Sequence, residues 1–192
     1  MDDLPFTIDL AISINDDAWR KNVSDIDSLT TEAIQTTLGA VSKEFNLAPL
    51  ADAQKPAVEI SLVFTDDAEV QILNRDHRNK DAPTNVLSFP NTPLDQTELA
   101  DAMWMKEPLM LGDVVMARET LIREAAEQNK SIRDHLTHLL VHGVLHLAGF
   151  DHMEENEAEK MENLEIMILQ SLHISSPYEL SEQPRQETPD QK

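Results

Sequence analysis

One stretch organises this sequence: His142-Gly143-Val144-Leu145-His146-Leu147-Ala148-Gly149-Phe150-Asp151-His152. Its histidines recur with the spacing H-x3-H-x5-H. His142 and His146 are four residues apart, so a helix would present both on one face. Gly149 can end that helix in a left-handed conformation, and the turn would bring His152 towards the other two imidazoles. Three converging neutral imidazoles are typical of a catalytic zinc site, which keeps its fourth position open for water.

One residue of this stretch separates it from the metalloproteases. The spacing H-x3-H-x2-G-x2-H matches the ligand pattern of metzincin proteases, except that Gly143 stands where they have Glu. That Glu accepts a proton from zinc-bound water, which Gly143 cannot do, and we expect Gly143 to leave room above the metal for a bulky substrate. The metal alone can still lower the pKa of bound water to ~7. Asp151 and the glutamates 154, 155 and 157 are candidates for the proton acceptor, because they lie close to His152 in the sequence. The sequence does not choose between them.

Composition favours one globular domain in a reducing compartment. The chain has 192 residues, 41% of them hydrophobic, and no cysteine, which excludes disulfides and thiolate metal ligands. The N-terminal residues show no secretory signal, and no apolar run of about 18 residues predicts a membrane span, so we expect a cytoplasmic protein without a membrane partner. We interpret residues 1–174 as a single metallo-enzyme domain and 175–192 as an acidic, polar and disordered tail.

Apolar periodicity changes several times along the chain, which predicts a single-domain α+β fold with a mixed sheet of about four strands. The helix that would carry His142 and His146 is apolar on most sides, so we expect it to be central, buried and flanked by other helices. The inward face of the last helix is expected to consist of Met161, Leu164, Met167, Ile168 and Leu172. The expected strands are 6–14, 58–64, 86–89 (at an edge) and 109–117; the expected helices are 25–46, 66–77, 117–129, 132–148 and 154–172; and 90–108 is expected to be a surface loop.

Three blocks of sequence agree with one known family. The first is the histidine stretch, which is similar to the signature H-G-x-L-H-L-x-G-[FY]-D-H. The second, residues 73–90, reads LNRDHRNKDAPTNVLSFP and is similar to L-N-x-x-[YW]-R-x-K-D-x-P-T-[DN]-V-L-S-F-P, with His77 where an aromatic residue is common. The third is Leu111-Gly112-Asp113-Val114-Val115, which is similar to L-G-D-[IV]. In this order the blocks resemble the YbeY family of bacterial endoribonucleases, which mature ribosomal RNA.

The resemblance implies a zinc-dependent endoribonuclease that cuts single-stranded RNA, in the maturation of the 3′ end of small-subunit (16S) rRNA and in ribosome quality control. It implies that His142, His146 and His152 bind one Zn²⁺ ion and that Arg78 is the key residue facing the metal. Metal-bound water would then attack the phosphodiester or assist its cleavage. The chemistry of Arg78 agrees, because a guanidinium fork fits phosphate oxygens and a fixed cation stabilises the charge that they carry in the transition state.

Other polar residues of these blocks have weaker assignments. We expect Arg75 and Lys80 to guide the RNA backbone, although ordinary surface charge explains them nearly as well. Asp113, His138 and Asp151 are candidates for groups that hydrogen-bond a metal-binding imidazole, and His138 could also carry a proton.

The net charge of −21 opposes electrostatic attraction to RNA. We therefore expect the acidic residues to lie on the outer helices, in 90–108 and in the tail, with a basic cleft near 75–80. Ribosomal RNA and small-subunit proteins are the implied partners. Two alternatives stay open. One is a metallopeptidase-like hydrolase, which Gly143 disfavours. The other is a non-catalytic ribosome-assembly factor with a structural metal, which a three-ligand site disfavours because structural zinc normally has four protein ligands.

Overall fold

A four-stranded mixed sheet organises the computed structural model, which describes residues 4–50 and 55–177. The strands are β1 (Thr7–Ile14), β2 (Ala57–Thr65), β3 (Val86–Pro90) and β4 (Leu109–Ala117). Their order across the sheet is β1-β2-β4-β3, with β1, β2 and β4 parallel and β3 antiparallel to β4 at the edge. The predicted α+β fold with about four strands is confirmed, as is the edge position of the third strand.

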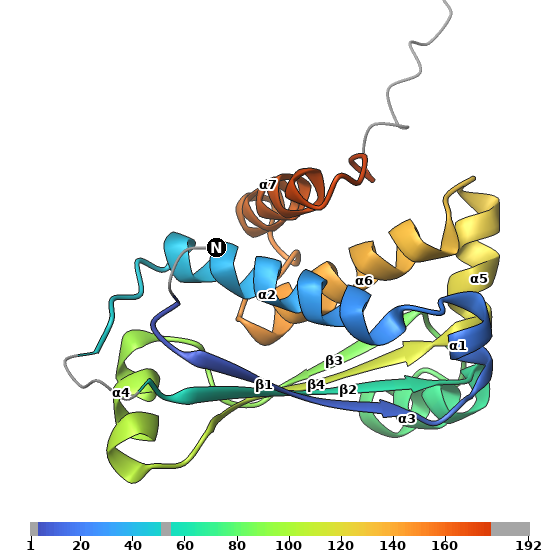
Figure 1. Cartoon of the computed structure of the whole chain (residues 1–192). Coiled ribbons are helices and arrows are strands. Elements are labelled where there is room, and N and C mark those ends of the chain that lie inside the picture. Colours follow the sequence, from blue (N-terminus) through green and yellow to red (C-terminus); the bar gives the residue numbers. More distant parts are fainter. Residues whose placement is uncertain (1–3, 51–54, 178–192) are drawn as a thin grey trace, which may run out of the picture.

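Helices cover the two faces of this sheet unequally (Figure 1). The described helices are α1 (Ala18–Asn22), α2 (Ile26–Glu44), α3 (Asp67–Arg78), α4 (Gln96–Met105), α5 (Arg118–Glu127), α6 (Ile132–Leu147) and α7 (Glu155–Ser171). Helices α2 and α6 lie across one face with α7 packed outside them, whereas α3 covers part of the other face. The large core lies on the side of α2 and α6, and a smaller cluster of Val70, Leu87, Val115 and Ala117 lies under α3.

Helix α6 is the central helix that the sequence predicts. Ser131 caps its first turn, because the hydroxyl oxygen of Ser131 accepts a hydrogen bond of 3.0 Å from the backbone N–H of Asp134. Most of its apolar residues are buried, and it packs against α2, α5, α7, β3 and β4. This packing on several sides holds the histidines of α6 in fixed positions relative to β3.

At Gly143, α6 lies very close to the sheet. A Cβ atom at this position would be 3.0 Å from Val114 Cγ1 and 3.3 Å from Ser88 Oγ, which is tighter than ordinary van der Waals contact. The expectation that Gly143 leaves room for a substrate is therefore wrong, since this side of the helix faces β4 and β3. The missing side chain instead allows close packing between α6 and the sheet.

The segment 90–108, which we expected to be a surface loop, contains helix α4. Asp95 caps this helix by accepting hydrogen bonds of 2.8 and 2.9 Å from two backbone N–H groups of the first turn. Leu94 and Leu99 are buried in the core. The expectation was wrong because the prolines of this segment flank the helix and do not interrupt it.

The predicted tail, 175–192, falls almost entirely outside the described residues, which end at residue 177. Among the helices that the structure describes, none has the combination of length and apolarity that crossing a membrane requires.

Candidate metal centre

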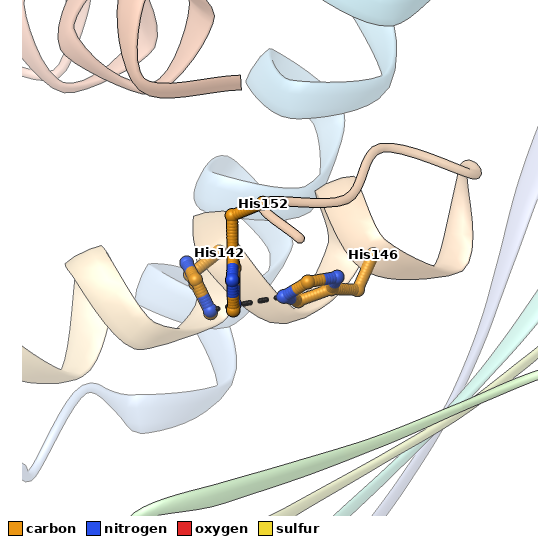
Figure 2. A group of neighbouring side chains, drawn as sticks. All are labelled: His142, His146 and His152. Carbon is orange, nitrogen blue, oxygen red and sulfur yellow. Dashed lines mark hydrogen bonds between the residues drawn. The ribbon is translucent and has the colours of Figure 1, made fainter. Parts of the chain in front are cut away.

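Three histidines meet near the C-terminal end of α6. His142 and His146 lie on the same face of the helix, and their Nε2 atoms are 3.1 Å apart. His152 comes from the loop after the helix, and Figure 2 shows its ring beside the other two. One nitrogen atom from each imidazole lies within 4.8 Å of the others. The convergence that the spacing predicts is therefore present in the structure.

The turn after α6 brings His152 into this cluster. Gly149 has a φ of +96°, a conformation that favours glycine. Its backbone N–H donates to the carbonyl oxygen of His146 at 3.1 Å, and the N–H of Phe150 donates to that of Leu145 at 3.0 Å. These two bonds form a Schellman motif. The chain therefore reverses at the glycine that the sequence indicates.

The same turn orients the imidazole of His146. Its Nδ1 atom lies 3.0 Å from the carbonyl oxygen of Phe150. A proton on Nδ1 can be donated to that oxygen, which leaves the Nε2 lone pair for a metal. Burial, followed by the positive charges that His142 and His152 can carry, lowers the pKa of His146 from 6.5 to about 4. His146 is therefore uncharged at neutral pH, as a metal ligand must be.

A buried carboxylate lies beside the outer nitrogen of His142. The Oε1 atom of Glu165 in α7 is 3.3 Å from His142 Nδ1, and the Glu165 side chain is 0% exposed. Sequence patterning did not single out Glu165, and Met167 was expected to face inward from this helix. Met167 is 62% exposed, so that expectation is wrong. Helical spacing could have identified Glu165 as a buried residue, because it lies on the inward face of α7 with Leu164 and Ile168.

The geometry of the cluster fits a single transition-metal ion. In a tetrahedral zinc site with Zn–N bonds of about 2.0–2.1 Å, two ligand nitrogens lie roughly 3.3 Å apart. The Nε2 atoms of His142 and His146 are separated by a similar distance, 3.1 Å. A donor set of imidazoles alone suits zinc, and also copper, iron or nickel. The residues present therefore fit a bound metal without identifying it.

A cleft of about 590 Å³ joins the three histidines to Arg78. Arg78 is the last residue of α3, and Asn79 ends that helix with a φ of 57°. The Nη2 atom of Arg78 donates a hydrogen bond of 3.1 Å to the carbonyl oxygen of Ser88 in β3. A guanidinium has five N–H donors, so this bond orients Arg78 and leaves donors for an anion. The cleft is also lined by Thr84, Asn85, Val86, Pro90 and Asp151.

Of the basic residues at 75–80, only Arg78 lines the cleft. Arg75 is exposed and pairs with the neighbouring aspartate at 2.8 Å. Lys80 is also exposed and lies outside the cleft. The expectation of a basic cleft near 75–80 is therefore wrong, because Arg78 shares the cleft with the carboxylate of Asp151 and has no second cation from this cluster beside it.

Asp113 does not support the metal centre. It is exposed on β4, whereas its neighbours Gly112 and Val114 lie against Leu147 and Gly143 of α6. Because successive side chains of a strand point to opposite faces, Asp113 lies on the face of the sheet away from α6. Its proposed contact with an imidazole is therefore excluded by the fold.

The other two supporting candidates lie close to the histidines. Asp151 lines the cleft, and its Oδ1 atom accepts a hydrogen bond of 2.7 Å from the backbone N–H of His152. His138 lies outside the cleft, and its Nε2 atom is 3.3 Å from the Oε1 atom of Glu165. Neither side chain is a further member of the three-histidine cluster.

Comparison with known proteins finds relatives over most of the chain. The family model of endoribonuclease YbeY matches residues 14–173. Proteins named endoribonuclease YbeY from Allorhizobium ampelinum and Agrobacterium fabrum are 46% and 44% identical over 172 and 171 residues, and each match covers 89% of this chain and 95% of the relative. The protein of that name from Rhodospirillum rubrum is 42% identical over 186 residues, which is 96% of this chain and 88% of the relative.

The fold is also similar to that of a solved structure, the solution structure of TM1509 from Thermotoga maritima. The TM-score is 0.50 with 20% sequence identity, and the match covers 93% of this chain and 100% of that chain. A likeness at this identity supports the fold alone. The family-model match over residues 14–173 and the identity of 42–46% to its curated members show that this chain belongs to the endoribonuclease YbeY family.

Proposed function

We propose that this chain is a zinc-dependent endoribonuclease that cuts single-stranded RNA in small-subunit rRNA maturation and ribosome quality control. The proposal is carried by one observation, that Arg78 lines the same cleft as His142, His146 and His152. A fixed guanidinium beside a metal-binding cluster suits an anionic substrate such as a phosphodiester. The relatives named above support the choice of RNA, since each is named an endoribonuclease.

The chain's own residues have distinct tasks in this reaction. A bound Zn²⁺ would supply Lewis acidity and lower the pKa of water. The carbonyl oxygen of Phe150 orients His146. Arg78, oriented by the carbonyl oxygen of Ser88, would hold a non-bridging phosphate oxygen and stabilise the negative charge of the transition state.

Asp151 is our choice for the proton acceptor that Gly143 cannot provide. It lines the cleft, whereas the glutamates at 154, 155 and 157 do not. One of its oxygens accepts from the backbone N–H of His152, which fixes the carboxylate and leaves the second oxygen to accept a proton.

Strand β3 argues against a peptide substrate. Many proteins bind an extended peptide by adding it to an exposed sheet edge, which requires free backbone groups. Along the edge of β3 that lines the cleft, the carbonyl oxygen of Ser88 already accepts from Arg78. The N–H of Val86 donates to Asn85 Oδ1 at 2.7 Å, and Pro90 has no N–H. Two of the backbone groups that a peptide would need along this edge are therefore already engaged, which disfavours the metallopeptidase alternative.

The charge distribution bears on how RNA reaches the cleft. With a net charge of −21 and one arginine from the 75–80 cluster in the cleft, electrostatic attraction of free RNA should be weak. We propose that small-subunit ribosomal proteins help to present the RNA. Arg75 and Lys80 would contact its backbone outside the cleft.

The test compares wild type, metal-stripped wild type and His146→Ala for zinc content and for cleavage of single-stranded RNA and of peptides. Wild type should bind about one zinc per chain and cut RNA but not peptides. His146→Ala should lose zinc and RNA cleavage together. Arg20→Ala is the control, because Arg20 is an exposed arginine paired with Asp27 outside the cleft.

Two results would contradict the proposal. RNA cleavage at the wild-type rate after the metal has been stripped would exclude a metal-dependent reaction. A peptidase activity that persists through repurification and is lost in His146→Ala would instead favour the metallopeptidase alternative.

A further inference from the structure

Two histidines on successive turns of α6 share one carboxylate. His138 Nε2 and His142 Nδ1 each lie 3.3 Å from the Oε1 atom of Glu165. His142 lines the cleft of the metal centre, whereas His138 lines a separate cavity of about 360 Å³. Glu165 therefore lies between a metal-binding histidine and a histidine outside the cleft.

The burial of Glu165 indicates that its carboxyl group has a role beyond packing. Its side chain is 0% exposed, and its neighbours on the inward face of α7, Leu164 and Ile168, are buried apolar residues. An ionised carboxylate removed from water costs free energy unless hydrogen-bond donors compensate it. Packing alone would be satisfied by an apolar side chain at this position. The two imidazoles beside Oε1 can each present an N–H donor to it.

The orientation of His142 shows what this carboxylate can do. The Nε2 atoms of His142 and His146 face each other at 3.1 Å, so the nitrogen of His142 beside Glu165 is the outer one, Nδ1. A proton held on Nδ1 leaves the lone pair of Nε2 directed into the cluster. A carboxylate next to the outer nitrogen of a metal-binding histidine fixes its tautomer and ring orientation.

We propose that Glu165 is a positioning residue for the metal centre. It accepts the Nδ1 proton of His142, and His138 holds the carboxylate from its other side. The two separations of 3.3 Å are ion-pair distances that exceed the 2.7–2.9 Å of a charge-assisted hydrogen bond, so each imidazole would move slightly closer to Oε1 to donate. This inference rests on the metal site of the proposed function.

The test uses Glu165→Gln, which keeps the shape of the side chain and removes the ionised acceptor. Glu162→Gln is the matched control, because Glu162 is exposed on the same helix. Metal-free proteins are titrated with Co²⁺ against a competing chelator, and the visible absorption spectrum is recorded. Glu165→Gln should bind Co²⁺ about 10–100-fold more weakly and with an altered spectrum, while the control matches wild type.

The outcomes separate this inference from the proposed function. Wild-type affinity and spectrum in Glu165→Gln would overturn the role of Glu165 and leave the metal site intact. Failure of the wild type to bind Co²⁺ would overturn the proposed function and this inference with it.

A measurement on the unaltered protein covers the case in which Glu165→Gln does not fold. In the Zn²⁺-loaded wild type with ¹⁵N-labelled histidine, NMR should find the proton of His142 on Nδ1, protected from exchange with water. A proton on Nε2, with Nδ1 as the metal-bound nitrogen, would overturn the inference.

Discussion

The Nε2 atoms of His142 and His146 face each other at 3.1 Å, so a proton or a metal ion must lie between these two imidazoles. Their outer nitrogens are directed elsewhere: Nδ1 of His146 lies beside the carbonyl oxygen of Phe150, and Nδ1 of His142 lies beside Glu165. Contacts within the fold therefore orient two of the proposed ligands. Such preorganisation strengthens binding because little conformational freedom is lost on association.

Zinc binding should accordingly stabilise the folded protein. At a free Zn²⁺ concentration 100-fold above Kd, linkage adds about 2.7 kcal/mol to the free energy of unfolding. For a chain of this length, that corresponds to an increase in Tm of roughly 5–11 °C. Thermal melts with Zn²⁺ and with EDTA measure the difference. His146→Ala should show no such shift, and a shift that persists in this variant would place the metal elsewhere.

Arg78→Ala should slow RNA cleavage strongly without releasing the metal. The lost bond to the Ser88 carbonyl contributes only about 1.5–3 kcal/mol to stability, so the variant should fold. Loss of one transition-state donor should lower kcat about 10²–10³-fold. Arg78→Lys keeps the charge without the planar fork and should have an intermediate rate. Single-turnover cleavage of a labelled RNA, with zinc content measured in parallel, checks this; wild-type kcat in Arg78→Ala would exclude the assigned role.

The histidine cluster was predictable because its geometry is local. His142, His146 and Gly149 lie within a helical turn and the Schellman motif that follows it, and their relative positions depend on nearby residues. Arg78 belongs to a different helix, α3, and no local pattern shows that this helix ends at the cleft. Its place in the site followed from the family resemblance, which carries information about the whole fold.

Two misplaced residues show where pattern alone fails. β4 contributes buried side chains to both faces of the sheet, so its sequence does not reveal which face α6 covers. Asp113, a candidate to hydrogen-bond an imidazole, lies on the face away from α6. In α7, Met167 was expected inside because it is hydrophobic. Helical spacing from Met161 instead selects Leu164 and Glu165, which are both buried.

Acid should destabilise the metal-free protein between pH 6.5 and about 4. Burial, then the charges of His142 and His152, lowers the pKa of His146 from 6.5 to about 4, and burial also lowers the pKa of His135. In this range the unfolded chain binds protons that the folded chain does not, so the free energy of unfolding decreases as pH falls. Above pH 6.5, His146 contributes no pH dependence.

Denaturant unfolding at pH values from about 7.5 to about 4.5, in the presence of EDTA, measures this decrease. His146→Asn should show a smaller decrease than wild type, because the substituted residue does not titrate. An identical slope in both proteins would mean that His146 is not the source of the effect.

Gly143→Ala should destabilise the fold, although alanine is the better helix former. The new Cβ would lie 3.0 Å from Val114 Cγ1 and 3.3 Å from Ser88 Oγ, and overpacking of this kind costs about 1–3 kcal/mol. Gly39 in α2 is the matched control, because a Cβ there would meet nothing within 4 Å. Gly39→Ala should stabilise by up to about 1 kcal/mol. Equal effects of the two substitutions in guanidinium unfolding would show that α6 tolerates a side chain at position 143.

Val114, the residue that the new Cβ at position 143 would contact, provides a check on this prediction. Val114→Ala removes the two γ-methyl groups that the new Cβ would meet, so it should cost less free energy in the Gly143→Ala background than in wild type. A double-mutant cycle measures this coupling from four unfolding curves. A favourable coupling would assign the destabilisation to the α6–β4 contact, and a coupling near zero would assign it to another contact. The first result would also explain why Glu, the protease's residue at this position, cannot be accommodated here.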